Sequence, residues 1–391
     1  MTAAEILGEL VAVPTPSSVS NLPLLAWVSG FLERYGWHAE LFSYEDEAGV
    51  AKANLIAWAG AAKRPERVDL AFVCHTDTVP YAADWDGALV LERRGDVLHG
   101  CGSCDVKGAL ACFLAAVSEA FSEDAGTHLR HKNNNVAKVG HPDLFGSVAL
   151  ILTADEEIGC RGMERLLDAV QMRIGSAIVS EPTSLLAGIA GKGYGLARVT
   201  VEGREAHSAF PQKGVSAIAA AARLIGRIEA EASSEANDFK EDGLFDPART
   251  TLNIGVIEGG TAKNIVPRRC WFLVEWRPLP GENPAAVLGR LRELAAQEAG
   301  AGVVIQVEGL RAEAGFAAVA RGPLQLRLAQ ELDGNPIGIS FGSEASRVAR
   351  IADEVIVIGP GDMRTAHSDR ECVPIAELER WTGVLAGLFC G

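Results

Sequence analysis

The sequence reads LAFVCHTD at residues 70–77, where a short apolar run ends in a histidine and an acidic residue. Three later apolar runs of strand length are also followed by acidic residues or a histidine. They are VALIL at 148–152, AIV at 177–179 and VIVI at 355–358. Short apolar runs that alternate with helical patterns are typical of parallel strands buried on both faces. We therefore predict an α/β fold with a mixed, mostly parallel sheet and helices on both faces.

The segments around these runs predict the other elements of the sheet domain. Apolar residues recur with the helical period in several segments, and further stretches have strand character. The predicted helices are 3–12, 22–36, 106–122, 162–170, 323–332 and 375–389, and the predicted strands are 53–59, 69–74, 147–153, 176–180 and 354–358. The polar segment 123–146, which holds His128, His131 and His141, is predicted to be a surface connection and not a metal site.

A different pattern begins after Pro182 and predicts a second domain. Its expected elements are a strand at 194–202, a helix at 214–232, strands at 250–258 and 269–277, a helix at 284–300 and a strand at 302–308. That order, βαββαβ, is the ferredoxin-like arrangement. We predict that this domain, residues 187–309, is inserted between two parts of the sheet domain, residues 1–186 and 310–391.

Composition restricts the partners and the compartment. The chain of 391 residues suits two domains, and 48% hydrophobic residues provide material for a large core. A net charge of −15 without any basic run argues against nucleic acid or an anionic membrane as a partner. No apolar stretch has the length of a membrane span, and Glu5 and Glu9 occupy positions where a secretory signal carries basic residues. We therefore expect a cytoplasmic protein.

The cysteines and glycines exclude two other classes of site. The eight cysteines lie mostly in apolar runs, as reduced core thiols do. Cys101 and Cys104 form one C-x-x-C pair without a second pair, so we expect no structural zinc site there. The stretch GCGSCD at 100–105 lacks the third glycine of a dinucleotide-binding fingerprint, which argues against a cofactor-dependent oxidoreductase.

The residues that follow the apolar runs have the chemistry of metal ligands. In an open α/β sheet, ligands bind at the carboxyl ends of the strands. Each acidic residue alone is more often a helix cap, and each histidine more often structural, but clustered carboxylates repel one another unless a cation neutralises them. A mixture of histidines and carboxylates suits zinc, with cobalt or manganese as substitutes. The candidates at this edge are His75 with Asp77, the acidic run 155–157, Glu181, His367, and Asp105 from the loop before the 106–122 helix.

Five motifs resemble those of one enzyme family, in the same order and over essentially the whole chain. They are HTDTVP at 75–80, GCGSCDVKG at 100–108, DEE at 155–157, SEP at 180–182 and AHS at 206–208. The family is that of the co-catalytic zinc deacetylases and carboxypeptidases. This resemblance implies two zinc ions, with His75 and Glu181 on one, Glu157 and His367 on the other, and Asp105 bridging both. It also implies that the inserted domain is a lid through which two chains form a homodimer.

The resemblance also implies roles for residues that are not ligands. Asp77 would hold the imidazole of His75, and Glu156 would be the general base for a water molecule that the zinc ions activate. His207 would reach the oxyanion of the partner subunit's site. Asn264 and Arg277 would hold the substrate, Arg277 through its α-carboxylate, although the glutamate at 275 departs from the family's more frequent aspartate.

The C-terminal motifs narrow the substrate class. FGSEA at 341–345, GPGD at 359–362 and AHSDRE at 366–371 look like the acetylornithine deacetylases and their acetylcitrulline-specific relatives. The expected reaction is hydrolysis of N-acetylornithine or N-acetylcitrulline to the amino acid and acetate, in arginine biosynthesis, with Glu344 facing the substrate side chain. Two alternatives within the family are a succinyl-diaminopimelate desuccinylase and a metallocarboxypeptidase. An alternative of another class is a non-catalytic binder of amino acids or peptides.

Overall fold

The computed structural model describes residues 1–121, 145–234, 243–300, 302–318 and 321–390. The chain divides into two compact units. The first comprises Met1–Ile189, Ala318–Ile337 and Ser343–Gly391, and the second comprises Ala190–Ala317 and Gly338–Gly342. Residues 123–144 of the polar segment that we predicted to be a surface connection lie outside the described residues. In the described part of the chain, no helix is both long and apolar enough to cross a membrane.

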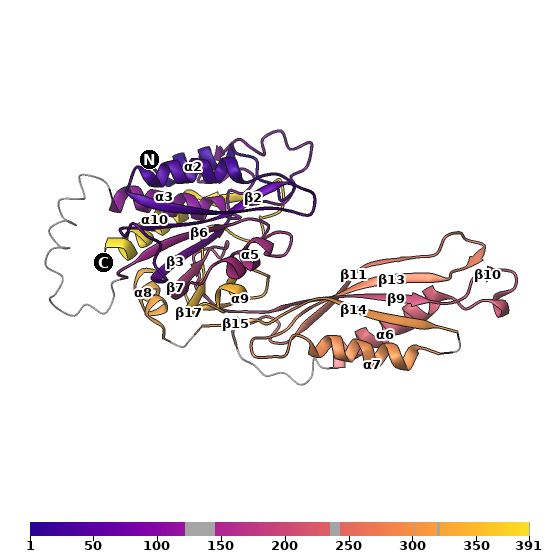
Figure 1. Ribbon diagram of the computed structural model, residues 1–391. Coiled ribbons are helices and arrows are strands. Elements are labelled where there is room, and N and C mark those ends of the chain that lie inside the picture. The colour runs from indigo at the N-terminus through magenta and orange to yellow at the C-terminus, as the bar shows by residue number, and fades with distance from the viewer. Residues whose placement is uncertain (122–144, 235–242, 301, 319–320, 391) are drawn as a thin grey trace. The chain divides into compact units, whose positions relative to one another are not determined.

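A mixed sheet forms the centre of the first unit, as predicted (Figure 1). Its strands lie in the order β1 (Trp37–Glu45), β2 (Ala51–Ala59), β6 (Val148–Thr153), β3 (Arg67–His75), β7 (Arg173–Val179), β17 (Ala352–Val357) and β8 (Gly188–Gly191). β6, β3, β7 and β17 run parallel to one another. β1, β2 and β8 pair antiparallel, and the end of β8 also pairs with β15 (Phe316–Ala317). The predicted buried runs are therefore the parallel strands of this sheet.

Helices cover both faces of that sheet. One side carries α1 (Ala3–Val11), α2 (Leu22–Glu33), α3 (Lys107–Ala120) and α10 (Ile375–Cys390). α5 (Arg161–Ala169) and α9 (Ala345–Val348) contact the other face, where Met163, Leu166 and Val348 lie near Ile56 and Ile151. α8 (Pro323–Glu331) contacts β17. This two-sided cover explains why the parallel strands are apolar throughout.

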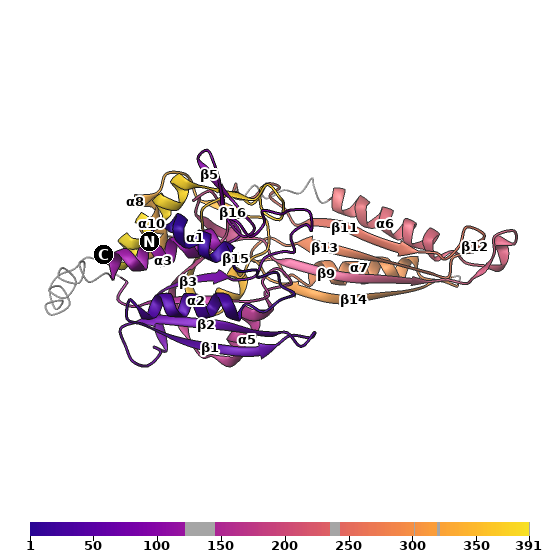
Figure 2. The same cartoon turned by 90° about the horizontal axis from the view of Figure 1, so that it is seen from above.

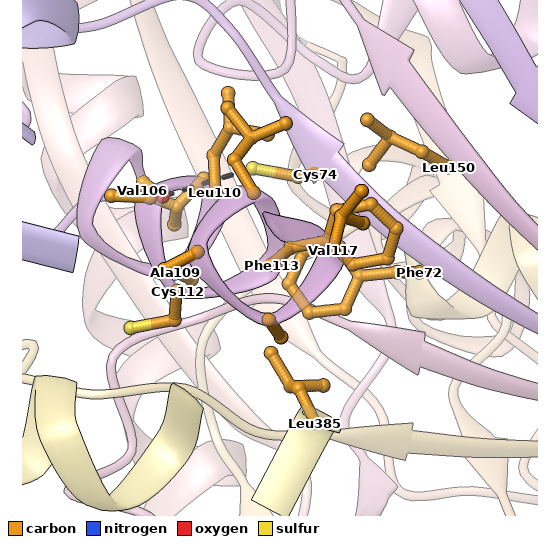
Figure 3. Close-up of a cluster of buried hydrophobic side chains, with 14 of the residues drawn as sticks. Phe72, Cys74, Val106, Ala109, Leu110, Cys112, Phe113, Val117, Leu150 and Leu385 are labelled. Atoms are coloured by element: carbon orange, nitrogen blue, oxygen red, sulfur yellow. Dashed lines mark hydrogen bonds between the residues drawn. The ribbon is translucent and has the colours of Figure 1, made fainter. Parts of the chain in front are cut away.

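α3 is the central helix of the core. Its sequence, KGALACFLAAVSEA, is apolar on nearly every side, and 12 of its 14 residues are buried, as expected of a helix enclosed by other elements. Phe113 packs against Phe72 of β3, and Figure 3 shows both rings together with Leu385 of α10. α3 begins two residues after Asp105, so the same packing that buries the helix fixes the position of that candidate ligand.

Our strand assignment missed β1 and several short strands. Only Trp37 of β1 is buried, because β1 is an edge strand that pairs with β2 alone. Its sequence therefore lacks the apolar run that identified the central strands. The short strands that were missed are β8 and β15, given above, and β4 (Glu92–Arg94), β5 (Val97–His99), β18 (Cys372–Pro374), β10 (Ala206–His207), β12 (Ile265–Val266) and β16 (Ile337–Ile339). The cysteines whose side chains the structure describes, Cys74, Cys101, Cys104, Cys112, Cys160, Cys270 and Cys372, are free, and of these all but Cys372 are buried.

The second unit has the predicted ferredoxin-like arrangement (Figure 2). Along the chain it contains β9 (Tyr194–Glu202), α6 (Ala217–Ser234), β11 (Thr251–Gly259), β13 (Arg269–Arg277), α7 (Ala286–Glu298) and β14 (Val304–Glu313). The sheet order is β11-β13-β9-β14, with all pairs antiparallel. Alternate residues of β9 and β13 are buried in one cluster with Leu224 and Ile228 of α6 and Leu291 and Leu294 of α7.

We predict that Gly195→Ala destabilises the second unit. Trp276 is fully buried, and a Cβ at Gly195 would overlap its indole ring. Overpacking of this kind costs about 1–3 kcal/mol, so the urea midpoint followed by tryptophan fluorescence should fall.

The control is Gly226→Ala on α6, where no atom of the described residues lies within 4 Å of an added Cβ. Because alanine favours a helix over glycine by about 0.5–1 kcal/mol, this variant should be as stable as the parent or more stable. Equal midpoints for Gly195→Ala and the parent would show that the core of the second unit is not tightly packed around Trp276.

Candidate active site

The parallel strands deliver the candidate metal ligands to one edge of the first unit's sheet. His75 is the last residue of β3, Glu157 follows β6, Glu181 follows β7, and His367 lies in the loop after β17. Because these strands are parallel, their carboxyl ends meet at the same edge. Asp105 reaches this edge from the loop before α3.

Asp105 lies at the centre of the cluster. Its Oδ1 is 3.1 Å from Nε2 of His75, and its Oδ2 is 3.1 Å from Nε2 of His367. The same nitrogen of His367 is 3.1 Å from Oε1 of Glu157. Ligand atoms of His75, Asp105 and Glu157 all lie within 4.8 Å of one another, a grouping that could hold a metal ion. One carboxylate thus faces a different histidine with each of its oxygens.

The electrostatics of the cluster reflect acidic groups crowded in a buried place. Burial, then the charges of Asp105 and Glu156, raise the pKa of Glu181 well above its usual range. Hydrogen bonds to Asp105 and then Glu157 raise the pKa of His367 to about 10. His75 is buried, but the His367 side chain is 47% exposed, so the cluster is open to solvent on the His367 side. Such a site favours cations.

Asp77 contacts His75 through its main chain and the loop of Glu156 and Glu157 through its side chain. Nδ1 of His75 donates to the carbonyl oxygen of Asp77 at 2.9 Å, whereas Oδ1 of Asp77 is 3.7 Å from that nitrogen. We expected Asp77 to hold this ring, and the structure places its main-chain carbonyl in that position. A proton on Nδ1 leaves Nε2 unprotonated and able to bind a metal ion. The carboxylate accepts from the main-chain N–H groups of Glu156 and Glu157, and from the Ser17 hydroxyl.

Glu156, the candidate base, lies in a buried acidic environment. Burial raises the pKa of Glu156 to about 8; the positive charge of His75 opposes this effect, and the charges of Glu157 and Glu344 add to it. The thiol of Cys160 donates to Oε1 of Glu156 at 3.2 Å. Glu344 is only 1% exposed; its Oε2 accepts from the Thr153 hydroxyl at 2.9 Å, and its Oε1 has no hydrogen-bond partner among the described residues.

A buried ion pair that we did not predict supports the loop of Glu156 and Glu157. Lys52 of β2 is 1% exposed and forms an ion pair with Asp155, and the hydroxyl of Tyr44 in β1 donates to Oδ2 of Asp155 at 2.8 Å. Asp155 has a left-handed backbone, with φ of 59°. A lysine inside an apolar run, at AKANLIAWA in residues 51–59, was the available signal, because buried lysines are rare unless paired.

His207 and Asn264 lie together at one end of the second unit's sheet. His207 of β10 pairs with Ile265 of β12, and the Ser208 N–H donates to the carbonyl of Asn264 at 2.9 Å. The N–H of Ala209 donates to Nδ1 of His207 at 3.1 Å. Since Nδ1 is the acceptor in that bond, the neutral ring carries its proton on Nε2 and can donate from there.

Arg277 lies at the opposite end of β13 and is held on two sides. Its Nε donates to Oε1 of Glu275 at 2.8 Å, and its guanidinium stacks over the ring of Tyr194, with 4.6 Å from Cζ to the ring centroid. Arg311 stacks on the same ring at 4.5 Å. The structure therefore separates Arg277 from the other two candidate residues of this unit, His207 and Asn264.

Comparisons with known proteins agree with this geometry. The family model "Peptidase family M20/M25/M40" matches residues 71–131, and the model "Peptidase dimerisation domain" matches residues 189–303. Over 392 aligned residues, the chain is 39% identical to the acetylornithine deacetylase of Myxococcus xanthus, with 98% of this chain and 97% of that protein covered. The chain belongs to peptidase family M20/M25/M40. It is therefore a hydrolase.

Solved structures of other proteins share the fold. A tripeptidase from Staphylococcus aureus aligns with a TM-score of 0.75 and 19% identity, over 99% of this chain and 97% of its own. The YxeP protein of Bacillus subtilis, a dinuclear metal binding peptidase of this family, aligns with a TM-score of 0.68 and 14% identity, over 99% and 96% of the two chains. At these identities, the likeness concerns the fold.

Proposed function

We propose that this hydrolase is a zinc-dependent deacetylase of a small N-acetylated amino acid, N-acetylornithine or N-acetylcitrulline, and releases acetate in arginine biosynthesis. The observation that carries the proposal is the buried cluster around Asp105, in a chain that is 39% identical to an acetylornithine deacetylase over nearly its full length. The same cluster would serve a desuccinylase or a carboxypeptidase, and the identity to that relative is what favours the deacetylase reaction.

The donor set fits two zinc ions. Imidazole nitrogens and carboxylate oxygens are the usual zinc ligands in catalytic sites. Asp105 directs one oxygen toward His75 and the other toward His367, as a bridging ligand would. We assign Glu181 to the ion held by His75. We assign Glu157 to the ion held by His367, because Oε1 of Glu157 is 3.1 Å from Nε2 of His367.

The chemistry divides between the metal and the residues of the chain. When bound, zinc lowers the pKa of water toward neutrality and polarises the amide carbonyl. Glu156 accepts the proton of the attacking water, and the oxygen forms a bond to the carbonyl carbon. Glu156 then returns that proton to the departing nitrogen as the amide bond breaks. Two contacts position Glu156 for this role: Asp77 accepts a hydrogen bond from the main-chain N–H of Glu156, and the thiol of Cys160 donates to the Glu156 carboxylate.

The substrate's polar groups have matching partners among the candidate residues. Arg277 would bind the α-carboxylate, since the contacts with Glu275 and Tyr194 fix its guanidinium. Asn264 would add a side-chain amide. Glu344 offers a buried acceptor oxygen to the substrate's side chain, which would favour the cationic ornithine over the neutral citrulline.

The distance between Arg277 and His207 supports a homodimer. The nine residues of β13 separate the two ends of the sheet, a span of about 26 Å at about 3.3 Å per residue. A small acylated amino acid is far shorter than that. If both residues contact one substrate, they come from different chains, with His207 donating from Nε2 to the oxyanion in the partner's site.

The direct test is a substrate panel with metal control. N-acetylornithine should give the highest kcat/KM among N-acetylornithine, N-acetylcitrulline, N-acetyllysine and N-succinyl-diaminopimelate. Chelation should abolish turnover, and zinc or cobalt should restore it. A preference for the succinyl substrate would indicate the desuccinylase reaction, and full activity of protein shown by elemental analysis to be metal-free would refute the metal mechanism.

Glu156→Gln tests the base separately from the metal. The variant should keep its metal content because the side chain is not a ligand, while kcat falls by at least about 10²-fold. Glu157→Gln is the matched control, one residue away, and should lose metal instead. The opposite pattern in elemental analysis would reverse the two roles.

Mixing two inactive variants tests completion of the site by the partner. After subunit exchange between His207→Ala and Glu156→Ala, half of the dimers are mixed, and each mixed dimer has one intact site. Activity should therefore recover to about one quarter of the parent value. No recovery, with exchange verified by mass labelling, would mean that His207 does not act across the dimer.

A further inference from the structure

Glu371 binds the loop that carries Asp105. Its side chain is buried, and its Oε2 accepts from the N–H of Gly102 at 3.0 Å, while its Oε1 accepts from the N–H groups of Cys104 and Asp105 at 3.1 Å each. Three main-chain donors thus converge on one carboxylate, and one of them belongs to Asp105 itself.

The position of Glu371 is fixed by the strand pairing beside it. Cys372, the next residue, begins β18 and pairs with His99 at the end of β5. The N–H of Glu371 donates to the carbonyl of Ser368, next to His367. Glu371 therefore connects the loop that carries His367 with the loop that carries Asp105.

We propose that Glu371 is a positioning residue that sets how Asp105 divides its two oxygens between His75 and His367. This inference rests on the proposed function, in which Asp105 bridges two zinc ions. Hydrogen bonds from N–H groups to a charged carboxylate are about twice as strong as neutral ones. Such bonds around a ligand tune metal affinity, because they fix the orientation of the donor atoms.

A glutamine at 371 cannot make the same contacts. Its side-chain N–H₂ group would face at least one main-chain N–H, so one or two of the three hydrogen bonds are lost and a donor faces a donor. The Asp105 loop would then have alternative orientations while the five proposed ligands remain in the sequence.

Glu354 provides a matched control for general destabilisation. It is also buried, and its carboxylate accepts from the N–H groups of Leu324 and Gln325 at 2.9 Å each and from the Ser176 hydroxyl at 2.8 Å. These partners lie at the start of α8 and in β7, not in a ligand loop. Glu354→Gln thus removes the same kind of bond without acting on Asp105.

The test compares zinc affinity, by competition with a chromophoric chelator, and the visible spectrum of the cobalt-loaded protein. Glu371→Gln should raise the Kd for zinc by about 10- to 100-fold and alter the cobalt spectrum. Glu354→Gln should lower the Tm but leave both metal readouts at their parent values. Parent-like zinc affinity and spectrum in Glu371→Gln would overturn the proposal.

Glu371→Asp keeps the test decisive if Glu371→Gln does not fold. Aspartate retains both oxygens and the charge, but its side chain is one methylene shorter and cannot reach all three donors. It should weaken zinc binding less than glutamine does, and an unchanged Kd would overturn the proposal. A parent protein that binds no zinc would refute the proposed function as well, whereas a zinc-dependent parent with an unaffected Glu371→Gln would refute this inference alone.

Discussion

Carboxylates placed together in a buried site repel one another, and the first unit brings several of them to one edge of its sheet. The charges of Asp105 and Glu156 act on Glu181, and ligand atoms of Asp105 and Glu157 lie within 4.8 Å of each other. Among the described residues, His75 and His367 contact Asp105 and offset part of this charge. Burial and mutual repulsion raise the pKa of Glu156 and of Glu181. A divalent cation reduces this repulsion more effectively than protons do, because it neutralises several carboxylates at once. The rest of the first unit can be understood as the structure that holds these groups together.

The loops that carry these groups are held in place largely by hydrogen bonds from their main-chain N–H groups to buried carboxylates. Asp77 accepts from the N–H groups of Glu156 and Glu157, and Glu371 accepts from the loop of Asp105. Asp155 and His367 have left-handed backbones with φ near 60°. Residues other than glycine adopt this conformation at a cost of about 1–3 kcal/mol, which the buried pair of Lys52 with Asp155 helps to offset. The acidic residues thus serve two purposes: some face the proposed metal site, and others fix the backbone that carries them.

The sequence predicted which residues gather at this edge because the rule it relied on is local. A buried parallel strand is apolar over several residues, and the polar residue at its carboxyl end must lie at the common edge, as His75, Glu157 and Glu181 do. The supporting contacts were not predictable in this way. Lys52 and Asp155 are 103 residues apart, and Glu371 and Asp105 are 266 apart. No periodicity relates such pairs; they follow only from the packing of β1, β2 and β18 at the margins of the sheets. The hydrogen bond of His75 to the carbonyl rather than the carboxylate of Asp77 likewise depends on the course of the chain after β3.

The rigid sheet of the second unit keeps His207 and Arg277 apart within one chain. Its four strands form a single layer with α6 and α7 packed on one face, so its two ends cannot approach each other without disrupting that packing. The donor on His207 is at one end, and the guanidinium of Arg277 is at the other. In the proposed reaction, the α-carboxylate and the developing oxyanion are only a few bonds apart in the substrate. A rigid unit with its two functional groups so far apart can serve that substrate only when a second copy supplies one of them. The ferredoxin-like unit would then have two roles, because Arg277 at one end and His207 at the other would serve the sites of different subunits.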